Sequence, residues 1–401
     1  MGGPEHPHNS GMESAPRWVE DEQVTSQLTL ERVRRDVEVI SHAGLDTATF
    51  VEEFEATLQR AVPHVATCIA LVDPASNLLT GTFKFGDLQG NDGRDHQWAL
   101  MEYGGGDPTS FLDLIHRREL ACSVSGATGG DTARSPRLSQ FLEPTYGYRD
   151  ELRMVARQGG HSWGGLALFR GDGDPDFDAA EVEFVAGLSQ DFAAGLRSGL
   201  LTRLAGRAES CAPSPGPAVV IVDGTDEVGR VSMGAELLLR ELASETNMAD
   251  SSGIIGALVA RARRYAAGHV DELPWARARL PSGRWVVLHA APLAGPSGPS
   301  GEVVITIEEA RPPEIVPLVV AAFELTPRER DVTQLVLQDV DTKDIAAQLH
   351  MSRYTVQDHL KSVFDKAGVR SRRELIARIY FDQYVPRMGT ELGPGGGFLG
   401  S

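Results

Sequence analysis

The hydrophobic and polar positions of the first 90 residues follow a helical period and then a strand period. Apolar residues recur at three-to-four spacing over Leu30–Ile40 and Phe50–Val62, which predicts two helices. Thr67–Asp73 and Leu78–Phe85 are strand-like and flank a Pro-Ala-Ser-Asn sequence that is typical of a turn. The chain therefore begins with two predicted helices and a predicted β-hairpin.

A second hairpin and a long helix are predicted further along the chain. The strands are Arg149–Arg157 and Trp163–Arg170, joined by a Gly-Gly turn. Asp178 and Glu181 form a capping-box sequence at the start of the helix. Its apolar stripe is Val182, Val185, Leu188, Phe192 and Leu196. These elements predict an α+β domain in which helices cover an antiparallel sheet.

A second α+β unit is predicted after Cys211–Pro217, a sequence rich in Pro, Ser and Gly that indicates a hinge. The unit has one predicted helix, Ala235–Leu242, and a short strand at Arg230-Val231. Its other predicted strands are Val219–Asp223, Ala276–Leu280, Arg284–Ala290 and Glu302–Glu308. The sequence Arg311-Pro312-Pro313 then predicts a stiff linker.

The C-terminal pattern predicts four helices. Thr326, Pro327 and Glu329 form a helix start, and Thr342–Leu349 is a second short helix. Ser352 begins a third helix, which places three apolar residues inward: Val356, Leu360 and Val363. Its opposite face carries Gln357, Asp358 and Lys361. A last capping box, Ser371 to Glu374, begins the fourth helix.

The charge is distributed in a way that favours nucleic-acid binding by this C-terminal segment. The 401-residue chain has a net charge of −18, but residues 321–385 carry ten Lys and Arg against ten Asp and Glu. Within them, residues 351–380 carry seven basic against three acidic side chains, which predicts a patch that faces phosphates. No apolar run reaches the length of a membrane-spanning helix, and we expect a cytoplasmic protein without a membrane partner.

Specific residues of the last segment match a known family. They include Leu325-Thr326-Pro327-Arg328-Glu329, Lys343-Asp344-Ile345-Ala346, Thr355-Val356, His359-Leu360, Gly368-Val369 and Ser371-Arg372. Over about 60 residues the segment resembles the LuxR-type helix-turn-helix. Two residues depart from the pattern: Asp339 stands where glycine is usual, and Gln357 stands where lysine is frequent.

The resemblance implies that the third helix lies in the major groove of double-stranded DNA. Gln357 then suits adenine, Lys361 suits guanine, and Asp358 either accepts from cytosine or orients a neighbouring cation. The remaining predicted DNA contacts, chiefly to phosphates, are Lys343, Arg353, Tyr354, Thr355, His359, Lys366 and Arg372. For Gln357 and Asp358, ordinary surface positions are the alternative, and His359 has a structural alternative.

The two α+β units resemble sensor domains. Trp163 to Arg170, Phe177 and the following helix are similar to the end of a GAF domain, and the later strand order resembles a PAS domain. We predict a disordered leader (1–24), a GAF-like domain (25–205), a PAS-like domain (215–310), a helix-turn-helix domain (318–388) and a flexible tail (389–401). The resemblance implies a homodimer on a palindromic operator and a small-molecule ligand in the GAF-like domain. A ligand-binding or scaffold protein without operator specificity is the alternative.

Enzyme and metal signals are weak. Gly160 to Gly164 fits the G-x-S-x-G pattern around Ser162, but the following residues continue as a strand where a nucleophile elbow requires a helix. The acidic residues between Asp172 and Glu183 are spaced as in a calcium loop, yet Phe177 occupies the position that needs glycine. The P-loop pattern is absent, and Cys68 and Cys122 are expected to be inert thiols. We expect no catalytic activity, no metal and no cofactor.

Overall fold

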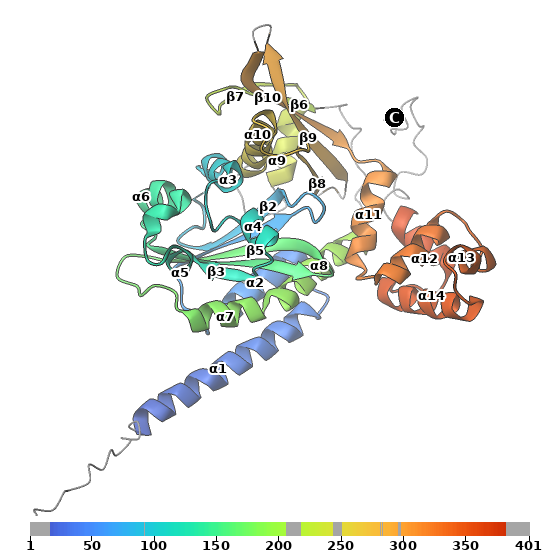
Figure 1. Ribbon diagram of the computed structural model, residues 1–401, viewed down its shortest axis with the longest axis horizontal. Helices are drawn as coiled ribbons and strands as arrows, with labels where there is room; N and C mark the ends of the chain where they lie inside the picture. The colour runs from blue at the N-terminus through green and yellow to red at the C-terminus, as the bar shows by residue number, and fades with distance from the viewer. Residues whose placement is uncertain are drawn as a thin grey trace, which may run out of the picture.

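A computed structural model of the chain describes residues 17–91, 93–205, 218–243, 251–280, 282, 284–295 and 298–381 (Figure 1). The predicted hinge at Cys211–Pro217 and the predicted tail at 389–401 lie outside these residues, as does the leader up to residue 16. Helix α1 begins at Arg17, so the last part of the predicted leader is helical.

The first α+β unit is built on a five-stranded antiparallel sheet in the order β2-β1-β5-β4-β3. Its strands are β1 (Ala66–Val72), β2 (Leu79–Gly86), β3 (Ala121–Ser123), β4 (Asp150–Gln158) and β5 (His161–Arg170). Both predicted hairpins are confirmed. At the second turn Gly159 and Gly160 have φ of 61° and 84°, a region that favours glycine.

Helices cover both faces of this sheet. Figure 1 shows α1, α2, α7 and α8 on one side, with α3 and α4 on the other. Their bounds are α1 (Arg17–Ser41), α2 (Thr47–Leu58), α3 (Asp95–Gly104), α4 (Phe111–Arg117), α5 (Val124–Thr128), α6 (Glu143–Tyr146), α7 (Ala179–Gly187) and α8 (Ser189–Ala205), with one 3₁₀ turn (Thr132–Arg134) and one π turn (Leu138–Leu142). Phe50, Phe54 and Phe192 pack α2 on α8 with ring centroids 4.2 to 5.9 Å apart.

The long helix predicted after Asp178 is two helices. The capping box of Asp178 and Glu181 is present at the start of α7. The chain breaks after Leu188 because the hydroxyl of Ser189 bonds to strand β4: it donates to the carbonyl of Val155 at 2.6 Å and accepts from the amide of Arg157 at 3.2 Å. The apolar stripe predicted from the sequence is therefore shared by α7 and α8.

The second unit has the same strand connectivity as the first. Its antiparallel sheet runs β7-β6-β10-β9-β8, which is the order of the first sheet with each strand number raised by five. The elements are β6 (Ala218–Val222), β7 (Val228–Val231), α9 (Ala235–Ala243), α10 (Ser252–Ala266), β8 (Trp275–Arg279), β9 (Trp285–Gly295) and β10 (Gly298–Glu309). All the strands predicted for this unit are present, whereas α10 was not predicted.

Helix α10 lies between its own sheet and helix α3 of the first unit (Figure 1). Gly256 permits this close approach, because a Cβ atom there would lie 2.6 Å from the carbonyl oxygen of His96. The packed pair α3 and α10 therefore lies between the two units, whereas strands β2 and β8 of the two sheets approach each other directly.

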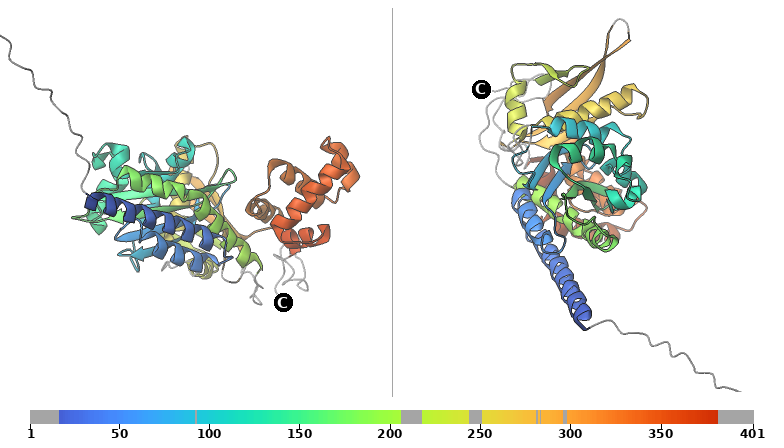
Figure 2. Two further views of the ribbon diagram at one scale, coloured as in Figure 1. Left: turned by 90° about the horizontal axis from the view of Figure 1, so that it is seen from below. Right: turned by 90° about the vertical axis from the view of Figure 1, so that its left-hand side faces the viewer.

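The C-terminal domain is all helical and stands beside the two α+β units, to which α11 connects it (Figure 2). The predicted stiff linker is wrong in form: Arg311 caps a helix and Pro312 is its first residue, a position where proline needs no amide partner. The elements are α11 (Pro312–Ala322), α12 (Pro327–Leu337), α13 (Thr342–Gln348), α14 (Arg353–Ala367), α15 (Arg372–Ile376) and a final π turn (Ala377–Phe381). Within the described residues, none of the helices has the length and apolarity needed to span a membrane.

Candidate functional site

Helix α14 has a buried face and a solvent face, as its spacing predicts. Val356 and Val363 are fully buried and Leu360 is 8% exposed, where they pack with α12 and α13. Gln357, Asp358 and Lys361 are exposed on the opposite side. The three candidate base-reading side chains therefore share the solvent face of one helix.

The turn before α14 sets the direction in which the helix leaves the domain core. His350 has φ of 55°, which reverses the chain within a few residues of the end of α13. Ser352 then caps α14 by accepting a hydrogen bond from the amide of Thr355 at 3.0 Å. Gly368 ends the helix with φ of 65°.

Most of the predicted phosphate contacts lie at or near the N-terminal end of α14. Arg353 and Thr355 are exposed, and Tyr354 is 74% exposed. Lys343 is exposed on α13, and His359 is half-buried. An N-terminal helix end with exposed basic and hydroxyl groups is suited to phosphate oxygens.

Two further predicted contacts, Lys366 and Arg372, are partly exposed and are paired with other groups of the domain. The ammonium of Lys366 lies 2.7 Å from a carboxylate oxygen of the buried Glu329 and 3.2 Å from the carbonyl of Glu324. Arg372 donates to the carbonyl of Val336 at 3.2 Å. These contacts join α14 and α15 to α12, which is a structural role that the sequence did not reveal.

Glu329 is the centre of the first of these contacts. It also accepts hydrogen bonds from the Ser362 hydroxyl at 2.6 Å and from the amide of Thr326 at 2.7 Å. Burial by itself raises the pKa of this carboxyl, but the hydrogen bonds from Lys366, Ser362 and Thr326 outweigh it and lower the pKa to about 2. Glu329 is therefore ionised at neutral pH.

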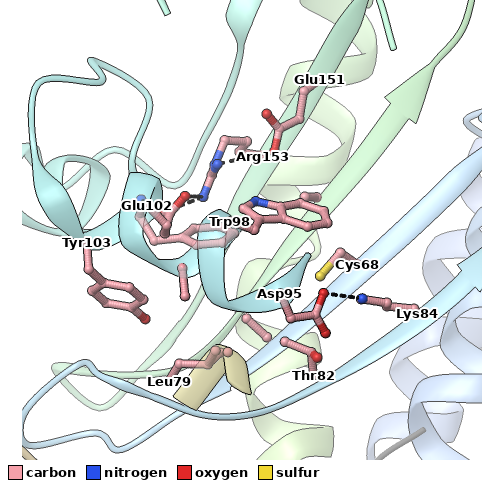
Figure 3. A pocket seen from close by; sticks show the side chains of 15 residues that line it. Cys68, Leu79, Thr82, Lys84, Asp95, Trp98, Glu102, Tyr103, Glu151 and Arg153 are labelled. Carbon is pink, nitrogen blue, oxygen red and sulfur yellow. Dashed lines mark hydrogen bonds and ion pairs between the residues drawn. The ribbon is translucent and has the colours of Figure 1, made fainter. Parts of the chain in front are cut away.

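The first α+β unit contains a cavity of about 60 Å³, here called the α3 cavity. It lies between the sheet and helix α3, and Gly253 of α10 contributes to its wall (Figure 3). Trp98, Tyr103, Phe111 and Leu79 supply much of its apolar surface. Ligand sites typically combine such an apolar wall with a few polar groups.

The charged side chains that line the α3 cavity are paired with one another. Arg153 donates to both carboxylate oxygens of Glu102 at 2.9 Å, and it lies 3.2 Å from Glu151 (Figure 3). Lys84 pairs with Asp95. Burial raises the pKa of Glu151 against the lowering effect of Arg137 and Arg153. None of these residues was predicted from the sequence. Lys84 is the only lysine before residue 343, and the charged residues within the buried strands follow no recognisable pattern.

The weak enzyme and metal signals have structural explanations. Ser162 is 3% exposed and lies in β5 of the hairpin, so the strand continues as expected and no elbow forms. Asp178 caps α7, and the part of the chain that the structure describes has no group of three or more His, Cys, Asp or Glu suited to a metal ion. Burial raises the pKa of the thiols of Cys68 and Cys122 to about 12, which keeps both protonated.

Comparisons with known proteins identify the C-terminal domain. Residues 324–379 match the family described as bacterial regulatory proteins, luxR family. The spore germination protein GerE of Bacillus subtilis is 40% identical over 55 residues, which are 14% of this chain and 74% of GerE. A putative HTH-type transcriptional regulator of Mycobacterium tuberculosis is 50% identical over 52 residues, 13% of this chain and only 6% of that protein.

Similarity to solved structures is weak. A phage VqmA-DPO complex has 20% identity and a TM-score of 0.23, with 40% of this chain and 79% of that chain covered. A bacteriophytochrome of R. palustris has 11% identity and the same TM-score, with 73% and 63% covered. Such scores support no conclusion about the two α+β units. By its match to GerE and to the family as a whole, the chain belongs to the luxR family of bacterial regulatory proteins, and residues 324–379 form the DNA-binding domain of that family.

Proposed function

We propose that this luxR-family regulator recognises a specific operator by placing α14 in the major groove of DNA. The observation that carries the proposal is the solvent face of α14, where Gln357, Asp358 and Lys361 are exposed together. Gln357 and Lys361 are four residues apart and so lie on adjacent turns of this face. They read base edges, and Asp358 reads cytosine or orients Lys361.

Phosphate contacts fix the domain on the duplex. We assign them to Lys343, Arg353, Tyr354, Thr355 and His359, which surround the N-terminal half of α14. Lys366 and Arg372 contribute by holding the helices, because their cationic groups already have partners within the domain.

The test compares two variants on an operator selected from random duplexes. Gln357→Ala should relax base preference at one operator position, by about 1 to 3 kcal/mol of discrimination, and leave the salt dependence unchanged. Lys343→Ala should weaken binding to all sequences equally and reduce the salt slope by about one. Fluorescence anisotropy over a salt series measures both quantities. Base preference that is unchanged in Gln357→Ala would contradict the assigned groove face.

We also propose that residues 25–205 are a GAF-like and residues 215–310 a PAS-like sensor domain. The shared strand order of the two sheets supports a common sensor architecture. The α3 cavity is then the ligand site of the GAF-like domain, and its internally paired charges favour a small organic molecule without net charge. A thermal-shift screen on the wild type and on Ala167→Leu, which narrows this cavity, tests the assignment.

The regulator acts as a homodimer on a palindromic operator, because one such domain makes too few base contacts for adequate specificity. Helix α1 extends from the body (Figure 2), and Leu28 and Val39 on it are 59% and 63% exposed. These two residues are three helical turns apart and lie on one face, which suits packing against a second copy. Light scattering of the wild type and of Leu28→Glu/Val39→Glu should show a dimer that the substitutions dissociate.

A further inference from the structure

A second cavity lies where both sensor units meet helix α11. This junction cavity has a volume of about 90 Å³ and is partly open to solvent. The first unit contributes Trp163 and Leu196, the second contributes Ala278 and Trp285, and α11 contributes Leu318. It is separate from the α3 cavity, with which it shares no lining residue.

The central charges of the junction cavity neutralise each other. Asp73 of the first unit accepts from Nε and Nη2 of Arg277 at 2.7 and 2.8 Å and from its backbone amide at 3.0 Å. Asp73 is 3% and Arg277 4% exposed. Arg279, the other charged lining residue, also has an interaction partner. Because Asp73 and Arg277 are paired with each other, neither is available as a counter-ion, and a charged occupant would lose its hydration against the apolar walls, so the cavity favours an uncharged molecule.

The walls favour an aromatic ring. Trp163 and Trp285 are 5% and 7% exposed and come from different units, with Leu196 and Leu318 beside them. Tryptophan and leucine surfaces favour planar apolar groups, and aromatic rings add edge and stacking contacts. The half-buried Thr80 provides a hydroxyl that can exchange a hydrogen bond with one polar substituent.

We propose that the junction cavity is a second small-molecule site, which takes a single uncharged aromatic ring with one hydrogen-bonding substituent. The volume is smaller than the roughly 150 Å³ of an engineered cavity that holds benzene. The opening to solvent accommodates the difference, since one edge of the ring remains outside.

Occupation of this site acts on the DNA-binding domain through α11. Arg277 donates to the carbonyl of Glu314 at 2.8 Å, and Leu318 touches the cavity one helical turn later. Only four residues separate the end of α11 at Ala322 from the start of α12 at Pro327. A ligand that shifts Leu318 therefore changes the position of α12 and, with it, DNA affinity.

Ligand-observed NMR titration of the full chain tests the site, with phenol as the neutral probe, benzoate as the anion and benzylamine as the cation. Phenol should bind at least about tenfold more tightly than either charged ring. Leu318→Phe and Leu200→Phe, which place a larger side chain at the wall of the junction cavity, should each weaken phenol binding about tenfold. Leu237→Phe, the matched control at an exposed position that lines neither cavity, should leave phenol binding unchanged.

Circular dichroism establishes that each variant is folded, and Leu200→Phe serves alone if Leu318→Phe is not. The proposal is overturned if phenol does not bind, if a charged ring binds as well, or if Leu237→Phe weakens binding as much as the wall variants do. DNA affinity measured without phenol tests the proposed function on its own. A failure of the DNA-binding proposal can therefore be distinguished from a failure of the ligand-site proposal.

Discussion

The contact between Lys366 and Glu329 predicts that one lysine of α14 stabilises the domain whereas another does not. Lys366→Met removes the cation that lies 2.7 Å from the buried carboxylate, and Lys361→Met removes an exposed lysine on the same helix. The first substitution leaves Glu329 buried with fewer partners. The second changes a solvated surface.

The pKa of Glu329 gives the size of the effect. A carboxyl whose pKa falls from about 4.3 when unfolded to about 2 when folded is stabilising by roughly 3 kcal/mol at neutral pH. Three groups share this total, and the side chain of Lys366 is 33% exposed, so its own part is roughly 1 to 2 kcal/mol. Lys361→Met should change the free energy of unfolding by less than about 0.5 kcal/mol.

The sign of the pH dependence follows from the lowered pKa. The stabilisation is complete above the unfolded pKa of about 4.3 and is lost as pH falls towards about 2. In Lys366→Met the pKa of Glu329 in the folded domain rises. The ionised carboxylate then stabilises the domain less at neutral pH, so the variant should lose less stability than the wild type when the pH falls. Urea unfolding of residues 318–388 between pH 7 and pH 3 measures both differences.

Two results would refute this reasoning. The first is an equal free energy of unfolding for Lys366→Met and Lys361→Met. The second is a loss of stability between pH 4.5 and pH 3 that is as large in Lys366→Met as in the wild type. A reduction of the DNA salt slope by about one, without loss of stability, would show instead that Lys366 leaves Glu329 and holds a phosphate.

Three further predictions concern the backbone and the thiols. Asp339 has φ of 60°, so Asp339→Gly should stabilise the domain by up to about 1 kcal/mol in urea unfolding, and a loss of stability would contradict strain there. Gly256→Leu should destabilise the full chain by roughly 1 to 3 kcal/mol and increase proteolysis between the two α+β units, because the new Cβ meets the carbonyl of His96. Unchanged proteolysis would argue against close packing of α10 on α3. Peptides with Cys68 and Cys122 should remain unalkylated by iodoacetamide at pH 8 in the native protein and react after unfolding, as mass spectrometry would show; rapid native alkylation would contradict the raised pKa.

The C-terminal domain could be predicted from its sequence because its determinants are local. Caps at Thr326, Ser352 and Ser371 mark three helix starts, and all three accept hydrogen bonds as expected. The departure at Asp339 also has a local meaning, since its left-handed backbone explains why glycine suits that position. What the pattern could not reveal was that Lys366 is paired, because its partner lies 37 residues earlier in the chain.

The two α+β units were predictable in their strands and amphipathic helices, but not where helices of the two units pack on each other. Helix α3 contacts the cavity on one side and α10 on another, so it lacks the single apolar stripe that identifies an amphipathic helix. Helix α10 contains Gly256, which lowers helix propensity although the close approach to α3 requires it. The residues that allow the two units to pack together are thus the ones that weaken the helical pattern in the sequences of α3 and α10.

The same reasoning explains why the contacts between the units are visible only in three dimensions. Asp73 and Arg277 are 204 residues apart, and Arg197 reaches from α8 to the carbonyl of Ala322 at 2.8 Å and to Glu324 at 2.9 Å. Each of these contacts joins an α+β unit to another unit or to the segment that precedes α12. Because buried or half-buried arginines hold both ends of α11, we expect a rearrangement of the two α+β units to displace α11 and the DNA-binding domain with it.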